Sequence, residues 1–162
     1  MEDMRIEELI DRYGDGILRL CLLYLGDRQL AEDAFQDTFV KAWKNLSSFK
    51  GESSVKTWLS QIAANTCRSM LRSPWLRMRR RSRSVDELLS LPAPEEEDHT
   101  SLVQAVCSLP DKYREVIVLH YEQEMKLWEI AQLLRIPANT VSTRLRKARK
   151  LLGKALEGED DA

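Results

Sequence analysis

The chain has 162 residues, of which 43% are hydrophobic, 7% are aromatic and 31% are charged. This length suits one domain or two very small ones, and the composition predicts a folded protein with a largely aliphatic core. No stretch approaches the roughly 18 to 20 apolar residues of a membrane span, and residues 1–11 are acidic where a secretory signal is basic. We therefore expect a cytoplasmic protein without direct membrane insertion.

The net charge of −1 is the sum of opposed blocks. Residues 1–37 and 86–98 each carry a charge of −6, whereas residues 68–83 and 135–154 each carry +7 and contain no acid. Near-neutrality therefore does not exclude a nucleic-acid-binding protein, because each basic block is long enough to form a surface of its own.

The N-terminal part predicts a module of three helices over residues 1–73. Apolar residues recur at helical spacing over residues 5–24, 28–46 and 55–72. Asp27 is the expected N-cap of the second helix, serines of the break at 47–54 begin the third, and Ser73 and Pro74 end it. The charged stretch 74–99 has no sustained period, contains three prolines and predicts a flexible linker.

The C-terminal part predicts a second module over residues 100–155, followed by an acidic tail, 156–162. Thr100 and Asp111 are the expected caps of two short helices. Two further helices, 126–134 and 138–152, are separated by only three residues, which predicts a tight helix-turn-helix corner. No strand pattern competes, so we expect an all-α fold of two small helical modules, with three helices in the first and four in the second.

The strongest local signal is the stretch from Glu129 to Arg149, EIAQLLRIPANTVSTRLRKAR. The apolar seam between its two helices is expected to comprise Ile130, Leu134, Ile136, Val141 and Leu145. The second helix is then left with outward hydroxyls and bases at Ser142, Thr143, Arg144, Arg146, Lys147, Arg149 and Lys150. Such a helix suits the major groove of DNA. The alternative is a solvated basic helix, although an ordinary solvated face mixes charges of both signs.

A second signal is the loop at 49–54 with the helix after it. The loop contains one glycine, two serines and a lysine, and the helix bears Gln61, Asn65, Arg68 and Arg72. This combination could hold an extruded single-stranded base. The alternative is that Gln61 and Asn65 are ordinary exposed residues and that Trp58 belongs to the core.

The sequence offers little for catalysis. Glu32, Asp33 and Asp37 could suggest a metal site, but no histidine or cysteine joins them, and the spacing places Asp37 well round the helix from Glu32. There is no glycine-rich phosphate loop, nucleophile elbow or zinc spacing. Cys21, Cys67 and Cys107 are far apart and are expected to be small buried hydrophobes. We expect no catalytic residue, metal or cofactor.

Taken together, the motifs resemble a bacterial RNA polymerase sigma factor of the small extracytoplasmic-function (ECF) group, which keeps only the second and fourth conserved regions of larger sigma factors. The resemblance covers about residues 5–72 and 100–153. Its motifs are LAEDAFQDTFVKAW at 30–43, FKGE at 49–52 with TWLSQIAAN at 57–65, LP at 109–110, and EIA at 129–131 with IPANTVSTRLRKAR at 136–149.

The resemblance implies three interaction surfaces. Core polymerase, through the clamp helices of its largest subunit, would be met by Glu32, Asp33, Phe35, Gln36 and Asp37. The minus-ten element would be recognised and melted by Lys50, Gly51, Glu52, Ser53, Ser54, Val55, Gln61, Asn65, Arg68 and Arg72. The minus-thirty-five element would be contacted by Asn139, Thr140, Ser142, Thr143, Arg144, Arg146, Lys147 and Arg149. Of the last set, Ser142, Thr143, Arg146 and Lys147 would read bases, and Arg144 and Arg149 would anchor phosphates.

The resemblance further implies contact with the flap of the second-largest subunit, promoter DNA as a partner, and an anti-sigma factor that could hold the chain at the membrane. The chain departs from the family pattern at the corner: Lys126 stands where a capping Ser is usual, and Glu124, Arg135 and Asn139 stand where Gly is frequent. Arg and Glu adopt a left-handed backbone less readily than Gly or Asn.

Three functions remain open at this stage. The first is a promoter-specificity subunit without catalytic activity. The second is a stand-alone helix-turn-helix regulator, which needs only the second module and normally binds palindromes as a dimer. The third is a metal-dependent nucleic-acid enzyme using Glu32, Asp33 and Asp37.

Overall fold

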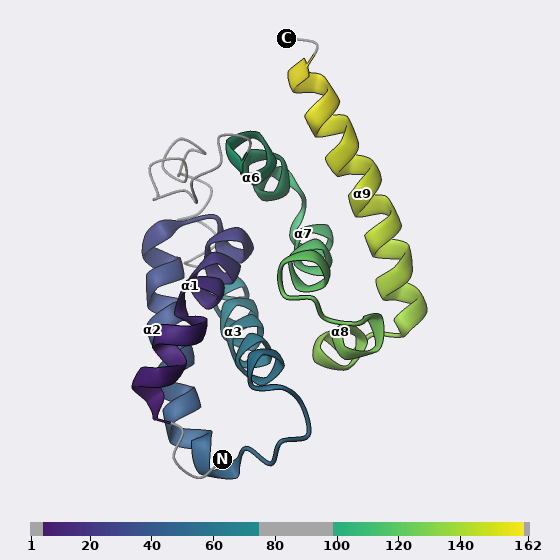
Figure 1. Ribbon diagram of the computed structural model, residues 1–162. Helices are drawn as coiled ribbons and strands as arrows, with labels where there is room; N and C mark the ends of the chain where they lie inside the picture. Colours follow the sequence, from purple (N-terminus) through teal and green to yellow (C-terminus); the bar gives the residue numbers. More distant parts are fainter. Residues whose placement is uncertain (1–4, 75–98, 161–162) are drawn as a thin grey trace. The chain divides into compact units, whose positions relative to one another are not determined.

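A computed structural model describes residues 5–74 and 99–160, and side chains within 5–74 and 101–157. The chain divides into two compact units, Met1–Ser82 and Arg83–Ala162, each considered by itself below. Within the described residues every regular element is helical (Figure 1), so the predicted all-α fold is confirmed. No helix in this part of the chain combines the length and the apolar character that a membrane crossing requires. Residues 75–98, which form nearly all of the predicted linker, lie outside the described residues.

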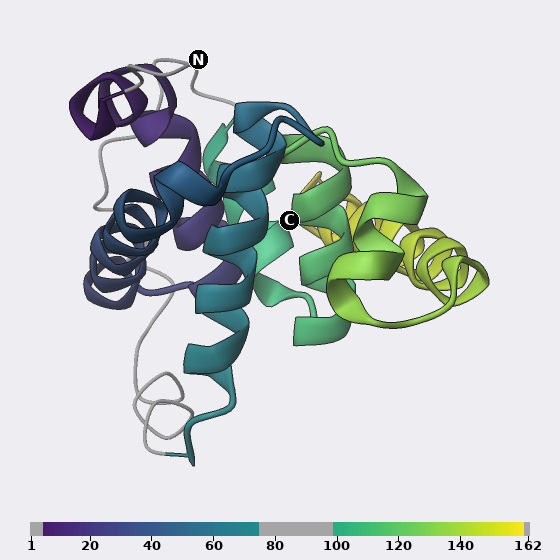
Figure 2. The ribbon, with the colours of Figure 1, turned by 90° about the horizontal axis from the view of Figure 1, so that it is seen from below.

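The first unit is a bundle in which all three long helices contact one another. Its elements are α1 (Ile6–Leu25), α2 (Arg28–Asn45), a 3₁₀ turn η1 (Leu46–Ser48) and α3 (Val55–Leu71). Figure 2 shows the three helices from below, where their axes can be followed separately. The three predicted helices are therefore confirmed, with ends within a few residues of those expected.

Two side chains start helices of this bundle as predicted. Asp27 Oδ1 accepts a hydrogen bond from the Leu30 backbone N–H at 3.0 Å and begins α2. Ser54 Oγ accepts one from the Thr57 backbone N–H at 3.0 Å and begins α3. Between α1 and α2, Gly26 adopts φ 69°, a left-handed conformation that closes α1 at little cost for a glycine.

The core of the bundle is aliphatic with small residues where helices approach. Leu20, Leu25, Leu59 and Ala63 have no exposed surface. Cys21 and Cys67 are also fully buried, as expected, whereas Cys107 in the second unit is only partly buried. A hydrogen bond with Cys21 and then burial itself raise the pKa of the Cys67 thiol, so Cys67 stays neutral in the core.

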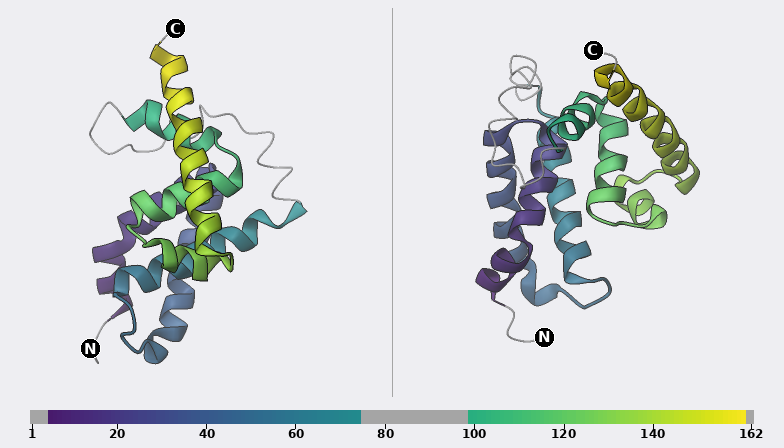
Figure 3. Two further views of the ribbon diagram at one scale, coloured as in Figure 1. Left: turned by 90° about the vertical axis from the view of Figure 1, so that its right-hand side faces the viewer. Right: turned by 45° about the horizontal axis from the view of Figure 1, so that its top comes forward.

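The part of the second unit that the structure describes, residues 99–160, consists of four α-helices and a π-helical segment. They are α6 (His99–Ser108), α7 (Asp111–Ile117), η2 (Val118–Glu122, the π-helix), α8 (Leu127–Leu134) and α9 (Ala138–Asp160). Helix α9 contacts α6, α7 and α8. Figure 3 shows α9 as the long helix that runs past the other three.

Three sequence-based boundaries differ from the structure. Helix α6 already begins at His99, so Thr100 lies inside it and is not its cap. Pro110, rather than Asp111, is the N-cap residue of α7: Asp111 is the first helical residue, and its carboxylate pairs with the guanidinium of Arg114. Helix α9 continues to Asp160, so most of the predicted acidic tail is helical.

Candidate nucleic-acid and partner interfaces

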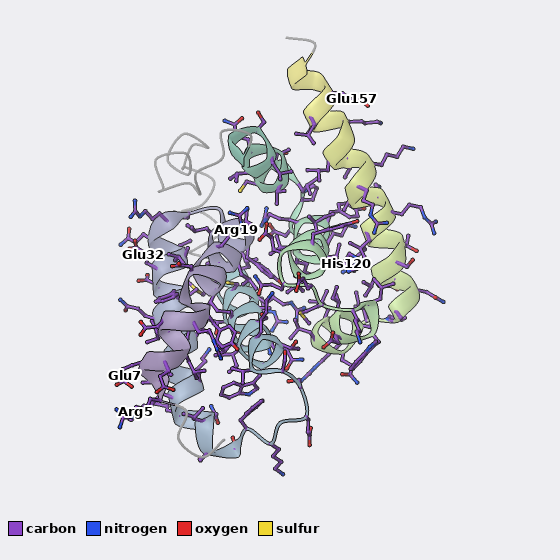
Figure 4. All side chains as sticks on the ribbon, in the orientation of Figure 1. Arg5, Glu7, Arg19, Glu32, His120 and Glu157 are labelled. Atoms are coloured by element: carbon purple, nitrogen blue, oxygen red, sulfur yellow. The ribbon has the colours of Figure 1, made fainter. Side chains whose placement is uncertain are left out.

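The acidic residues of α2 lie on its outer face. Glu32, Asp33, Gln36 and Asp37 are all exposed. Glu32 Oε1 pairs with Arg28 Nε at 3.1 Å, and Asp37 Oδ2 pairs with Lys41 Nζ at 3.1 Å. Each is a half-exposed pair spaced by four residues and contributes about 0.3–0.5 kcal/mol to the helix. Figure 4 shows Glu32 on the side of α2 that points away from the rest of the bundle.

Phe35 differs from the other residues predicted to meet polymerase. It is half-buried, and its ring lies 5.0 Å from that of Phe39, centroid to centroid. The Phe35 ring also packs close to Gly14 of α1, since a Cβ placed on Gly14 would lie only 3.7 Å from the ring. Phe35 therefore mainly joins α1 to α2, and only its exposed edge is open to a partner.

Sequence reasoning missed two apolar residues that extend this outer face. Val40 is 47% exposed and Trp43 is 62% exposed. Asp33, Gln36, Val40 and Trp43 are spaced by three, four and three residues, which places all four side chains along one stripe of α2. An exposed Trp and Val beside carboxylates is the composition of a protein-binding surface. Helical spacing from Gln36 was the signal that could have identified them.

The carboxylates do not assemble a metal site with other ligands. Within the described ranges, no group of three or more His, Cys, Asp or Glu side chains is placed to hold a metal ion. The pairing of Glu32 and Asp37 with basic residues of their own helix accounts for both carboxylates. The arrangement favours docking over metal binding.

The polar residues of α3 share one stripe. Gln61, Asn65, Arg68 and Arg72 are spaced by four, three and four residues, and all retain exposed surface. The buried side of the helix is formed instead by Leu59, Ser60, Ala63, Ala64, Thr66, Cys67 and Leu71. The structure therefore brings the four predicted DNA-binding residues of α3 together on the outside of the bundle.

The loop before α3 lies at one end of this stripe. Lys50, Gly51, Glu52 and Ser54 are exposed, and Gly51 has φ 74°, which favours glycine. The rings of Phe49 and Trp58 contact each other with centroids 4.9 Å apart and an interplanar angle of 38°. Trp58 is only half-buried, so it is not a pure core residue. The remaining loop residue, Ser53, and the first helical residue, Val55, are half-buried.

Helix α9 has three distinct sides. Its inner stripe is buried and consists of Val141, Leu145 and Ala148. Its exposed residues include Asn139, Thr143, Arg146, Lys147, Arg149 and Lys150. Three predicted contact residues are half-buried at the edges of the inner stripe: Thr140, Ser142 and Arg144. The predicted seam is confirmed by burial of Ile130, Leu134, Val141 and Leu145, while Ile136 is half-buried.

Two basic residues of α9 contact tyrosines from the preceding helices. The Arg149 guanidinium lies over the Tyr121 ring, 5.5 Å from its centroid, and Arg149 Nε donates a hydrogen bond to the Tyr121 hydroxyl. The Lys147 and Lys112 ammonium groups lie 5.4 Å and 5.1 Å from the centroid of the Tyr113 ring. A hydrogen bond with Lys147 is the main cause that lowers the pKa of Tyr113.

The corner between α8 and α9 is built without glycine. Arg135 closes α8 with φ 58° and ψ 45°, and Glu124 has φ 57°. Two backbone hydrogen bonds close the end of α8. Ala131 O accepts one from the Arg135 N–H and one, at 3.1 Å, from the Ile136 N–H. Both non-glycine residues therefore adopt the left-handed geometry.

The start of α8 is held in place without a capping serine. Glu129 Oε1 accepts a hydrogen bond from the Lys126 backbone N–H at 2.9 Å. This is the half of a capping box in which the residue at the third helical position reaches back to the N-cap. Lys126 consequently serves as the N-cap residue through its backbone alone.

Comparison with known proteins assigns both units. Residues 9–86 match the family described as Sigma-70 region 2, and residues 99–152 match Sigma-70, region 4. The ECF RNA polymerase sigma factor SigW of Bacillus subtilis is 34% identical over 163 residues, covering 92% of this chain and 87% of SigW. SigM of the same organism, also an ECF sigma factor, is 30% identical over 92% of this chain and 93% of its own length.

Solved structures show the same fold. The sigma factor RpoE from Bartonella quintana, in complex with the anti-sigma factor NepR, has a TM-score of 0.72 at 24% identity, over 93% of this chain and 96% of that one. CnrH, in complex with the cytosolic domain of CnrY, has a TM-score of 0.67 at 25% identity, over 94% and 88%. With both conserved regions matched in order, the chain belongs to the extracytoplasmic-function group of the sigma-70 family of RNA polymerase sigma factors.

Proposed function

We propose that this sigma factor, which directs RNA polymerase to promoters, does so through three separate surfaces and has no catalytic activity of its own. The observation that carries the proposal is the segregation of side chains: carboxylates with exposed apolar residues on α2, an amide and arginine stripe on α3, and bases with hydroxyls on α9. Each surface has the composition that its partner requires. The chain acts in the cytoplasm, where polymerase and promoter DNA are found.

The outer face of α2 is the docking site for the clamp helices of the largest polymerase subunit. Asp33, Gln36 and Asp37 supply polar contacts, and Val40 and Trp43 supply the apolar area that a stable contact needs. A tryptophan that becomes fully desolvated is typical of the few residues that dominate binding energy. Contact between the second unit and the flap of the second-largest subunit completes the holoenzyme.

The loop Lys50–Ser54 and the α3 stripe recognise and open the minus-ten element. Unstacking one base costs a few kcal/mol, which contacts in the loop and phosphate contacts from Arg68 and Arg72 offset without hydrolysis of any bond. Asn65, the exposed amide at the middle of the stripe, is suited to hydrogen-bond a base edge. The half-exposed Trp58 beside the loop adds apolar surface at the same place.

The outward side of α9 enters the major groove at the minus-thirty-five element. Thr143 and Arg146 are exposed opposite the buried stripe, and Asn139 lies in the first turn of the helix, where recognition helices contact bases. An anti-sigma factor that covers these surfaces would keep the chain silent. Such partners are typical of the family to which the chain belongs.

Reconstituted transcription tests the proposal. Purified chain and core polymerase should start transcription at promoters selected from a genomic library, whereas core polymerase alone should not. Asp33→Ala and Trp43→Ala should each weaken core binding at least tenfold, while Glu7→Ala, which removes an exposed carboxylate from α1, should not. No initiation at any promoter, with a known sigma factor active in parallel, would refute the assignment.

The same assay separates the two alternatives. A stand-alone helix-turn-helix regulator would bind its site tightly without core polymerase, and removal of residues 1–73 would leave that binding intact. A metal-dependent enzyme would show magnesium-dependent turnover of nucleic acid that Asp33→Ala and Asp37→Ala abolish. We expect neither result.

A further inference from the structure

Tyr121 and Arg149 form a cation–aromatic pair on the surface of the second unit. The guanidinium carbon lies 5.5 Å from the centroid of the ring. Arg149 Nε donates a hydrogen bond to the Tyr121 hydroxyl, and this bond occupies only one side of the guanidinium. The terminal N–H groups of Arg149 therefore remain available to an anion, and the hydroxyl keeps its own hydrogen to donate. Tyr121 is 53% exposed, so a ligand can reach the pair. The ring of His120, labelled in Figure 4, packs edge-on against the Tyr121 ring, with the two ring centroids 4.8 Å apart.

Tyr113 carries a second concentration of positive charge. The Lys112 and Lys147 ammonium groups lie 5.1 Å and 5.4 Å from its ring centroid. The hydrogen bond with Lys147 lowers the pKa of Tyr113, in keeping with two ammonium groups beside its ring. A phosphate oxygen near the same ammonium groups would be favoured for the same reason.

The two clusters lie on opposite sides of one buried contact. Ala148 has no exposed surface and belongs to the inner stripe of α9. Successive residues of an α-helix are about 100° apart, so Lys147 and Arg149 project to either side of Ala148. Their partners come from the first turn of α7, which packs along α9, and from the π-helical segment η2, which follows α7.

This placement matches the cross-section of DNA. The major groove is about 12 Å wide and a helix with its side chains is about 10–12 Å across, so a helix in the groove has a phosphate backbone on each side. If the outward residues Thr143 and Arg146 face the bases, the two sides of α9 face the two strands. Arg149 then points toward one backbone and Lys147 toward the other.

We propose that the Tyr121–Arg149 pair and the Tyr113–Lys112–Lys147 cluster are two phosphate-binding sites, one for each DNA strand, in which the tyrosines are positioning residues. The inference rests on the proposed binding of α9 at the minus-thirty-five element. It moves Lys147 from reading bases, as the family resemblance implied, to contacting the backbone. It also gives Tyr113, Tyr121 and Lys112 a function in DNA binding that their distance from α9 in the sequence conceals.

The test is the affinity of reconstituted holoenzyme for promoter DNA as a function of salt, on a parent minus-thirty-five sequence and its single-base variants. Lys147→Ala and Arg149→Ala should each reduce the slope of log affinity against log salt by about 0.9 and leave base preference unchanged. Arg146→Ala should instead relax preference at one position. Arg12→Ala, which removes an exposed base from α1, is the matched control and should do neither.

The tyrosines are tested by graded variants. Tyr121→Phe keeps the ring under Arg149 but removes the hydroxyl, and should lower affinity about three- to tenfold. Tyr121→Leu removes both the ring and the hydroxyl and should lower the affinity further. When Arg149→Ala is already present, Tyr121→Leu should lower the affinity little more, because the two residues act as one unit. Tyr113→Phe and Tyr113→Leu should behave in the same graded way with Lys147→Ala.

The outcomes separate the inference from the function on which it rests. A change of base preference caused by Lys147→Ala would overturn the backbone assignment of that residue. Unchanged affinity in Tyr121→Phe and Tyr121→Leu, with reduced affinity in Arg149→Ala, would overturn the positioning role while α9 remained the DNA-binding helix. If replacing the whole minus-thirty-five sequence changes nothing, the proposed function of α9 itself fails.

Discussion

Replacing Arg135 by glycine should stabilise the helix-turn-helix corner. Arg135 ends α8 with φ 58° and ψ 45°, a conformation that costs an L-residue about 1–2 kcal/mol and glycine almost nothing. Glycine in turn loses about 0.5–1 kcal/mol more chain entropy on folding than a residue with a side chain. The two hydrogen bonds from Arg135 and Ile136 to Ala131 O involve only backbone atoms and survive the change. The net expectation is a gain of about 0.7 kcal/mol.

Native-state amide hydrogen exchange measures this locally. A gain of about 0.7 kcal/mol should slow exchange of peptides covering 127–152 about threefold, since exchange through local opening follows the opening free energy. Gln132→Gly is the matched control, because Gln132 is an exposed residue inside the same helix with ordinary helical geometry. There glycine should cost about 1 kcal/mol and speed exchange about fivefold.

Glycine is expected to slow exchange at position 135 and to speed it at position 132, and this opposite effect makes the comparison decisive. If Arg135→Gly speeds exchange as Gln132→Gly does, then the left-handed backbone at Arg135 is not strained and the reasoning is wrong. Arg135→Ala provides a further check, because Ala also lacks the positive charge but does not adopt the left-handed region as readily as glycine. It should not slow exchange as Arg135→Gly does, which excludes the loss of charge as the explanation.

Three further predictions concern the cap, the thiols and the tyrosines. Asp27→Ala should lower the free energy of unfolding by about 0.5–2 kcal/mol in urea denaturation, because the backbone N–H that opens α2 loses its buried acceptor. In native protein a thiol reagent should modify Cys107 but not Cys67, which is buried and has a raised pKa; denaturation should release all thiols together. In an absorbance titration, Tyr113→Phe should remove a tyrosine ionisation whose pKa is lowered, and Lys147→Ala should move that ionisation upward. Because the pKa of Tyr113 is lowered in the fold, its stabilising contribution is present above the ordinary tyrosine pKa of about 10 and is lost as pH falls through the lowered value; a native titration identical in wild type and Lys147→Ala would contradict this.

Hydrophobic periodicity predicted the helices because each one buries a single continuous stripe. The caps at Asp27 and Ser54 were predictable, because each polar side chain directly precedes its helix and accepts a hydrogen bond from a backbone N–H. Asp111 is instead the first residue of α7, and its carboxylate pairs with the buried guanidinium of Arg114, which also donates to Leu109 O at 3.0 Å. A buried arginine is not visible in a sequence, since arginine is exposed at most positions.

The candidate surfaces divide in the same way. The α3 stripe and the inner stripe of α9 follow from helical spacing alone, so their residues could be assigned without a structure. The contact between Tyr121 and Arg149 spans 28 residues and depends on how η2 packs beside α9, which no local pattern records. Trp43 lies on the same stripe of α2 as Gln36 and could also have been assigned from helical spacing, but its 62% exposure could not be read from the sequence.

The seven positive charges at 135–154 are not equivalent once the helix is seen in its unit. Arg135 lies at the corner, Arg144 is half-buried at an edge, and Lys147 and Arg149 are held against tyrosines. That leaves Arg146 as the exposed base nearest the helix start on the outward side. If α9 binds DNA as proposed, most of the block should contribute affinity that falls with salt and does not depend on sequence. With acidic blocks elsewhere cancelling that charge to −1 overall, the free chain should bind DNA weakly, and sequence preference should appear when polymerase holds both units on one promoter.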